Sequence, residues 1–338
     1  MSARASLIFA TAALGIACLL PATALAQSLN LSGMGASSAP FTLSLTPSNP
    51  EPNSQPFVSF VSTNLDLTNA TLSLSVNGKN VYQGNVQPVA IQLGAAGSLT
   101  TVRATVTSNG VPYVQTLSLR PQDVSLVVEP LSSAPPLYPG SPLVPIGGNV
   151  RVVAVADLRT ASGVMLNPAT LSYSWTVDTA LIANSSGIGK DALLVASPQQ
   201  YRSRSVSVTV QSQDGSVVGG ASLTIQPSSP TVLLYRNDPL LGILFDHALS
   251  GSYTLTNAEA TLYAAPFSFD DSSGAPALQW FLNGSAAQTG PSITLRPTGQ
   301  GTGVANISVT GSSGPYTTAA ADLSLSFGTT TGSNLFGL

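Results

Sequence analysis

The sequence predicts an all-β protein built from three tandem β-sandwich domains. Residues 171–179 (Leu-Ser-Tyr-Ser-Trp-Thr-Val-Asp-Thr) alternate large apolar side chains with hydroxyls, a period of two that places the apolar groups on one face of a strand. Similar alternating blocks run into Asn77-Gly78 and Asn283-Gly284. The three blocks lie about a hundred residues apart, which indicates one domain type copied in tandem.

A second repeated element follows each block after about thirty residues. It is an alternating apolar strand that ends in a glycine turn, at Ser108-Asn109-Gly110, Gln213-Asp214-Gly215 and Ser312-Ser313-Gly314. Asn-Gly and Asp-Gly accept the positive φ angles of tight turns, so each element predicts a β-hairpin. No convincing stripe of helical period interrupts this pattern.

The domain bounds follow from composition. Arg4, the apolar run 7–20 and the small residues Ala24-Leu25-Ala26 predict a signal peptide over 1–26. We expect the small polar residues 27–39 to form a flexible leader and residues 328–338 a flexible tail. The rest divides at proline-containing joins into domains 40–121, 122–227 and 231–327.

Composition and charge argue against several classes of function. Charged residues make up 7% of the chain, against roughly 25% in ordinary soluble domains. A net charge of −3 argues against a protein that binds nucleic acid and against a polybasic patch that binds a membrane. Cleavage would remove Cys18, the single cysteine, so we expect no disulfide. The mature chain holds no apolar stretch long enough to span a membrane. We therefore expect an exported protein that is extracellular, cell-surface or periplasmic.

The repeated block resembles PKD and bacterial immunoglobulin-like domains, which are β-sandwiches. In this block an aromatic or apolar residue precedes Trp, an apolar residue and Asn or Asp follow it, and a Val-rich hairpin comes next. Residues 278–284 match best and 171–179 nearly as well, whereas Leu74 stands where the first block would have Trp. The chain is also similar to three-domain secreted proteins predicted from candidate-phylum bacteria, over 67–84, 135–158 and 232–249. These motifs carry no chemistry, so the resemblance assigns no functional residue.

Few residues suggest catalysis, a metal or a cofactor. His247 is the single histidine, and no Gly-x-Ser-x-Gly motif presents a serine for attack. Asp270 and Asp271 are weak calcium candidates, although no Asp-x-Asp-x-Asp-Gly loop surrounds them and a solvated loop is favoured. We expect no catalytic site, no bound metal and no cofactor.

Trp175 and Trp280 admit two interpretations. They could stack on carbohydrate from an exposed surface, but they share a strand face with Tyr173, Val177 and Leu278. We therefore expect both indoles in the cores.

The expected function is adhesion or cell-envelope or pilus assembly, through contact with a protein partner. Sandwich loops or exposed sheet edges would make that contact. Two segments, 130–145 and 239–249, supply the candidate contact residues: Tyr138, Pro139, Leu240, Leu241, Ile243 and Phe245. A carbohydrate-binding module that takes a glycan and a hydrolase of unrecognised type remain as alternatives.

Overall fold

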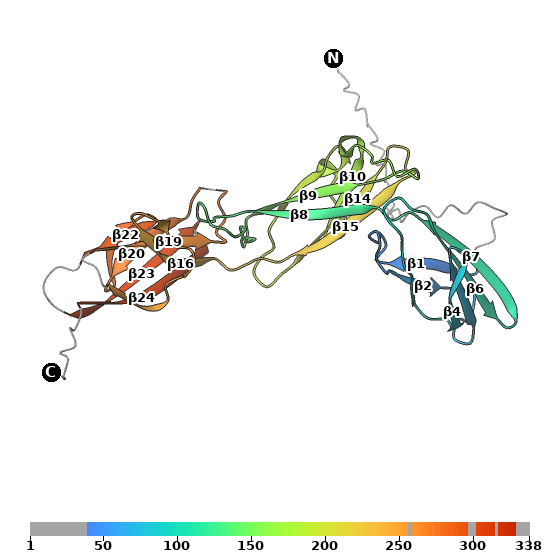
Figure 1. The fold of residues 1–338 in the computed structure, drawn as a ribbon, viewed down its shortest axis with the longest axis horizontal. Coiled ribbons are helices and arrows are strands. Elements are labelled where there is room, and N and C mark those ends of the chain that lie inside the picture. The colour runs from blue at the N-terminus through green and yellow to red at the C-terminus, as the bar shows by residue number, and fades with distance from the viewer. Residues whose placement is uncertain (1–38, 256–258, 273, 297–301, 315–316, 329–338) are drawn as a thin grey trace, which may run out of the picture. The chain divides into compact units, whose positions relative to one another are not determined.

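A computed structural model describes residues 39–255, 259–272, 274–296, 302–314 and 317–328. Within these ranges the chain is built of β-strands, joined by turns and two single-turn 3-10 helices at Pro168–Thr170 and Ala183–Ser185 (Figure 1). The all-β prediction is confirmed. The predicted signal peptide, the leader up to Ser38 and the tail from Thr329 lie outside the described residues.

Six sheets in the described ranges face one another in pairs, each pair around a core of its own. In the first sheet pair, one sheet has the order β1-β2-β5 and the other β4-β3-β6-β7. Their bounds are β1 Thr42–Thr46, β2 Phe57–Val61, β3 Thr71–Val76, β4 Lys79–Asn85, β5 Val89–Ala90, β6 Thr100–Ser108 and β7 Val111–Leu119.

The second sheet pair combines the order β13-β9-β8 with the order β11-β10-β14-β15, in which β12 also pairs with β10. The bounds are β8 Asp123–Leu131, β9 Asn149–Asp157, β10 Ser172–Val177, β11 Ala180–Leu181, β12 Gly187–Ile188, β13 Ala192–Ala196, β14 Arg204–Gln211 and β15 Val218–Ile225. Pro130 lies in the edge strand β8, where the missing N–H of proline is tolerated.

The third sheet pair combines the order β17-β16-β19-β22 with β18-β24-β23-β20-β21. The bounds are β16 Thr231–Asp238, β17 Gly242–Ile243, β18 Gly251–Leu255, β19 Ala260–Phe267, β20 Ala277–Leu282, β21 Ser285–Thr289, β22 Ser292–Leu295, β23 Gly303–Ser313 and β24 Thr317–Phe327. Strand β18 runs parallel to β24, and the other pairings of these strands are antiparallel.

Both tryptophans lie in the cores, as predicted. Trp175 on β10 and Trp280 on β20 are each 0% exposed. A buried indole N–H needs an acceptor, and each donates to a backbone carbonyl of the following loop: Trp175 Nε1 to Lys190 O at 2.9 Å, and Trp280 Nε1 to Gly290 O at 2.8 Å. In the first sheet pair Leu74 occupies the equivalent place on β3 and is also fully buried. The alternating apolar residues therefore point into the cores.

The strands that carry these residues each end in a tight turn with two consecutive positive φ angles. The pairs are Asn77-Gly78 (49° and 81°), Asp178-Thr179 (46° and 75°) and Asn283-Gly284 (50° and 80°). Such φ values are those of type I′ hairpin turns. The hairpins predicted at 108–110, 213–215 and 312–314 are confirmed by the antiparallel pairing of β6 with β7, β14 with β15 and β23 with β24. Thr179 is the exception, because a β-branched residue is strained at positive φ.

The first residue of each turn also binds the neighbouring strand segment. The side-chain oxygen of Asn77 accepts from Thr101 N at 2.8 Å, that of Asp178 from Ser205 N at 2.9 Å and that of Asn283 from Asn306 N at 2.9 Å. The backbone N–H of each turn residue donates to the carbonyl of the same partner. This two-way bond, here called the turn clamp, fixes the register between the central strand and the next long strand.

Some hydroxyl side chains on the outward faces bond across neighbouring strands. Thr254 pairs with Ser326 and Thr261 with Thr294 through side-chain hydroxyls across neighbouring strands. Within the described part, four ion pairs are formed, and their side chains are all at least one-third exposed. No helix there is long and apolar enough to cross a membrane.

The buried indole gives a first prediction. We expect Trp175→Ala to lower the free energy of unfolding of the second sheet pair by about 3–5 kcal/mol, since it removes a large core side chain. Trp175→Phe should cost less because it keeps most of the apolar volume. Urea denaturation followed by circular dichroism measures both values. A near-neutral Trp175→Ala would contradict the burial of this residue.

The strained turn gives a second prediction. We expect Thr179→Gly to stabilise the second sheet pair by about 1 kcal/mol, because glycine adopts positive φ without steric cost. The matched control is Gly284→Thr, which places the same strain in the third sheet pair and should destabilise it by a similar amount. Equal and opposite shifts of the two urea midpoints are expected. No change in either variant would show that the turn conformation carries no strain.

Candidate partner-contact site

Two of the predicted contact residues form the tip of an ordered hairpin between β16 and β17. Leu240 is 94% exposed and Leu241 76% exposed. The Asp238 carboxylate holds the turn by accepting hydrogen bonds from Leu240 N at 2.9 Å and Leu241 N at 3.0 Å. Those two backbone hydrogen bonds lower the pKa of Asp238. The turn 238–242, here called the leucine tip, therefore presents two large apolar side chains to solvent on a fixed backbone.

Ile243, Phe245, Ala248 and Leu249 of segment 239–249 pack within the chain. Alternation along β16 sends Val232 and Leu234 into the third core and Tyr235 to the opposite face of the sheet. Phe245 covers that face with its ring edge-on to Tyr235, at a centroid distance of 5.1 Å. Ile243 joins the same cluster and is half-buried. Of segment 239–249, the leucine tip is thus the part that exposes large apolar side chains.

Tyr138 reaches this cluster from the proline-rich segment. Its ring lies 5.6 Å from that of Phe245 and 4.9 Å from that of Phe267, both edge-on. Tyr138, one of the candidate contact residues, is therefore half-buried, because the apolar outer face of β16 and β19 offers it a place to pack. Burial and the neighbouring Tyr138 raise the pKa of Tyr235. Pro139 and the 97%-exposed Leu137 remain on the surface.

Hydrogen bonds attach segment 130–145 to the third sheet pair. Ser133 N donates to Phe269 O at 2.8 Å, and Phe269 N donates to Ser133 Oγ at 3.2 Å. The buried Ser268 hydroxyl contacts both Val144 O at 3.0 Å and Ser228 O at 2.8 Å. The segment leaves the second sheet pair through β8 and returns through β9. Its contacts with Ser268 and Phe269 join regions more than a hundred residues apart in sequence.

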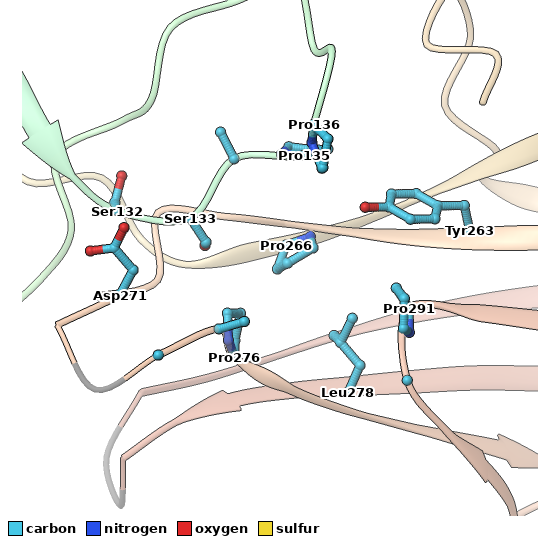
Figure 2. Close-up of a pocket in the computed structure, with 14 residues that line it drawn as sticks. Ser132, Ser133, Pro135, Pro136, Tyr263, Pro266, Asp271, Pro276, Leu278 and Pro291 are labelled. Atoms are coloured by element: carbon cyan, nitrogen blue, oxygen red, sulfur yellow. The ribbon is translucent and has the colours of Figure 1, made fainter. Parts of the chain in front are cut away.

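The attached segment closes one side of an apolar pocket of about 570 Å³ (Figure 2). Five proline rings line it, together with Tyr263 and Leu278: Pro135, Pro136, Pro266, Pro276 and Pro291. The volume falls in the range of about 300–1,000 Å³ that ligand pockets occupy. We call this site the proline pocket.

The core of the third sheet pair positions one wall of the proline pocket. Gly290 O accepts from the Trp280 indole, and Gly290 N donates to Leu278 O at 2.9 Å. These bonds fix the turn that carries Pro291. Tyr263 lies on β19 and its hydroxyl is directed into the space beneath Pro135 and Pro136 (Figure 2). Burial raises the pKa of Tyr263.

The remaining candidate residues are not brought together into a site. Asp270 accepts from the backbone N–H and hydroxyl of Ser272, while Asp271 is exposed at the rim of the proline pocket. His247 is exposed at the surface. Among the residues described, no group of three or more His, Cys, Asp or Glu side chains could hold a metal ion.

The sequence did not predict the proline pocket. Its lining comes from four separate stretches, 132–136, 263–266, 271–278 and 290–291, which meet only through the tertiary structure. The one signal in the sequence was the density of prolines in segment 130–145, which predicted an irregular chain and no regular central strand.

The Asp238 contacts give a third prediction. A carboxylate with a lowered folded pKa adds stability above its unfolded pKa of about 3.9, and that stability is lost as pH falls through the folded pKa. We therefore expect the amide resonances of Leu240 and Leu241 to shift together at acid pH, below the pH at which a free Asp titrates. A pH series of amide NMR spectra measures this. In Asp238→Asn the shift should vanish, and its persistence would assign it to another group.

Comparison with known proteins gives structural likeness only. No protein-family model and no curated protein sequence matches the chain. Among solved structures, it is similar to the central fibronectin-III array of RIM-binding protein, with 9% identity, 88% of this chain and 100% of that one covered, and a TM-score of 0.29. It is also similar to the three N-terminal domains of the bacteriophage RB49 highly immunogenic outer capsid protein, with 13% identity, coverage of 85% and 99%, and a TM-score of 0.20. A third match is SGBP-B from the Bacteroides ovatus mixed-linkage glucan utilization locus, solved with a mixed-linkage heptasaccharide, with 14% identity, coverage of 82% and 65%, and a TM-score of 0.23. All three scores lie below 0.5, so no functional argument is drawn from them.

Proposed function

We propose that this chain is an exported, non-enzymatic protein of three tandem immunoglobulin-like domains, which acts in adhesion or in cell-envelope or pilus assembly by contact with a protein partner. The leucine tip carries the proposal. Two adjacent leucines, 94% and 76% exposed, are held on a turn fixed by two hydrogen bonds to Asp238. An ordered apolar projection of this kind suits insertion into a pocket of another protein.

The order of the tip favours binding in a second way. Association costs free energy for every loop that must be immobilised at the interface. Because Asp238 already holds Leu240 N and Leu241 N, most of that cost would be avoided when the tip binds. The hydroxyl-rich, charge-poor surface supports a location outside the cytoplasm, as the predicted signal peptide does.

The two alternative functions have less support. A carbohydrate-binding module would use exposed aromatic platforms, but both tryptophans are in the cores and the rings of Tyr138 and Phe245 pack against other aromatic residues. A hydrolase would need His247 beside a nucleophile, but this histidine is exposed and no serine hydroxyl in the described ranges is hydrogen-bonded to it. Protein contact is therefore the function that we propose.

The fourth prediction tests the leucine tip in native cells. A photo-crosslinking residue at position 240 should give a discrete adduct with a cell-envelope or surface protein, identified by mass spectrometry of the sheared and wall fractions. Leu241→Asp in the same chain should weaken that contact about tenfold, because it places a charge in an apolar interface.

The matched control is a crosslinker at Leu181, which is 58% exposed in the second sheet pair. It should give no adduct with the same partner. Recovery of the protein only in the medium, with no adduct from position 240, would overturn the proposal and make glycan binding and hydrolysis the next activities to test.

A further inference from the structure

The walls of the proline pocket are formed before any ligand enters. A proline side chain has almost no rotamer entropy to lose, so the five lining rings can contact a ligand without being ordered by it. The hydrogen bonds of Ser133 with Phe269 hold one wall, and the bond from Trp280 to Gly290 O holds another. The site is therefore preorganised on two sides.

The lining favours an apolar ring over a sugar. Sugars need many hydrogen-bonding partners, and the pocket offers three side-chain hydroxyls. Two of these are already engaged: Ser132 donates to Leu143 O, and Ser133 Oγ accepts from Phe269 N. The Tyr263 hydroxyl is the third, and it has no hydrogen-bond partner among the described residues. A flat aromatic side chain with one polar atom fits such a lining, because its faces contact prolines while its polar atom meets Tyr263.

The negative charge of Asp271 at the rim of the pocket favours a ligand that also carries a positive charge. Asp271 is exposed beside the pocket, and within the described ranges its carboxylate oxygens form neither an ion pair nor a hydrogen bond. The nearest carboxylate in sequence, Asp270, is bound by Ser272 and so is less available. The negative charge at the rim is thus complementary to an Arg or Lys beside the aromatic residue.

We propose that the proline pocket binds a protein segment in which an aromatic side chain inserts among the prolines and an adjacent Arg or Lys pairs with Asp271. The inference rests on the proposed function, because it names the chemistry of a partner segment, but it uses a different surface from the leucine tip. Trp, Tyr and Arg are the residue types that most often dominate binding at protein interfaces.

The fifth prediction uses the whole mature chain with ¹⁵N labelling and the probe acetyl-Trp-Arg-amide. Titration should shift the amide resonances of Tyr263, Gly274 and Gly290, with a Kd on the order of 1 mM for so small a probe. Acetyl-Trp-Glu-amide should bind about two- to fivefold more weakly, the size expected of an exposed ion pair. Acetyl-Ala-Arg-amide, which lacks the ring, should give no shifts at the pocket.

Three variants test whether binding occurs at this site. Ala275→Trp fills the pocket from its exposed rim and should abolish the shifts, whereas Ala287→Trp on the exposed strand β21 is the matched control and should leave them unchanged. Asp271→Lys should reverse the preference, so that the Glu probe binds more tightly than the Arg probe. Thermal unfolding of each variant checks that the fold is retained.

Three outcomes would overturn the inference: no shifts at the pocket with any probe, equal loss of binding in Ala275→Trp and Ala287→Trp, or pocket shifts with cellohexaose and none with the Trp probes. Each can occur while position 240 still crosslinks to a partner protein, so failure at the pocket is distinguishable from failure of the proposed function. Conversely, a missing adduct at position 240 leaves the result at the pocket intact.

Discussion

The turn clamp at the end of each central strand is the interaction on which the rest of the structure depends. A strand that slips by one residue sends all its apolar side chains to the wrong face. The clamps at Asn77, Asp178 and Asn283 bind both the donor and the acceptor of one partner residue, so they hold the alternating pattern in the register that buries it. With no cysteine in the described ranges, the cores must hold the sheets together, and that depends on this register.

The buried indoles connect the cores to loops at the surface through hydrogen bonds. Each Trp N–H must find an acceptor, and each finds a carbonyl in the loop that leads to the opposite sheet. In the third sheet pair that carbonyl belongs to Gly290, which also lines the proline pocket. A residue that stabilises the core therefore also sets one wall of a candidate binding site, which links the stability of this sheet pair to the shape of the pocket.

Local patterns predicted the strands, the hairpin turns and the buried tryptophans, because a period of two and an Asn-Gly pair act over a few residues. The exposure of Leu240 and Leu241 could not be predicted in this way, because no local signal distinguishes these leucines from Phe245, which packs against Tyr235. The packing of Tyr138 could not be predicted for a related reason. Its partners, Phe245 and Phe267, lie more than a hundred residues away, and the outer face that they cover is formed only when β16 and β19 pair. The proline pocket could not be predicted for the same reason, because its lining residues lie far apart in the sequence.

The hydroxyl pairs on the outer strand faces, such as Thr254 with Ser326, have a consequence for the conditions under which the fold persists. Hydrogen bonds between neutral groups are not weakened by a counterion atmosphere, whereas interactions between exposed charges fade beyond a Debye length of about 8 Å at physiological ionic strength. With charged residues at 7% of the chain, little of the folding free energy is subject to screening. The same strand faces would therefore stay hydrated and folded in fresh water and in brine.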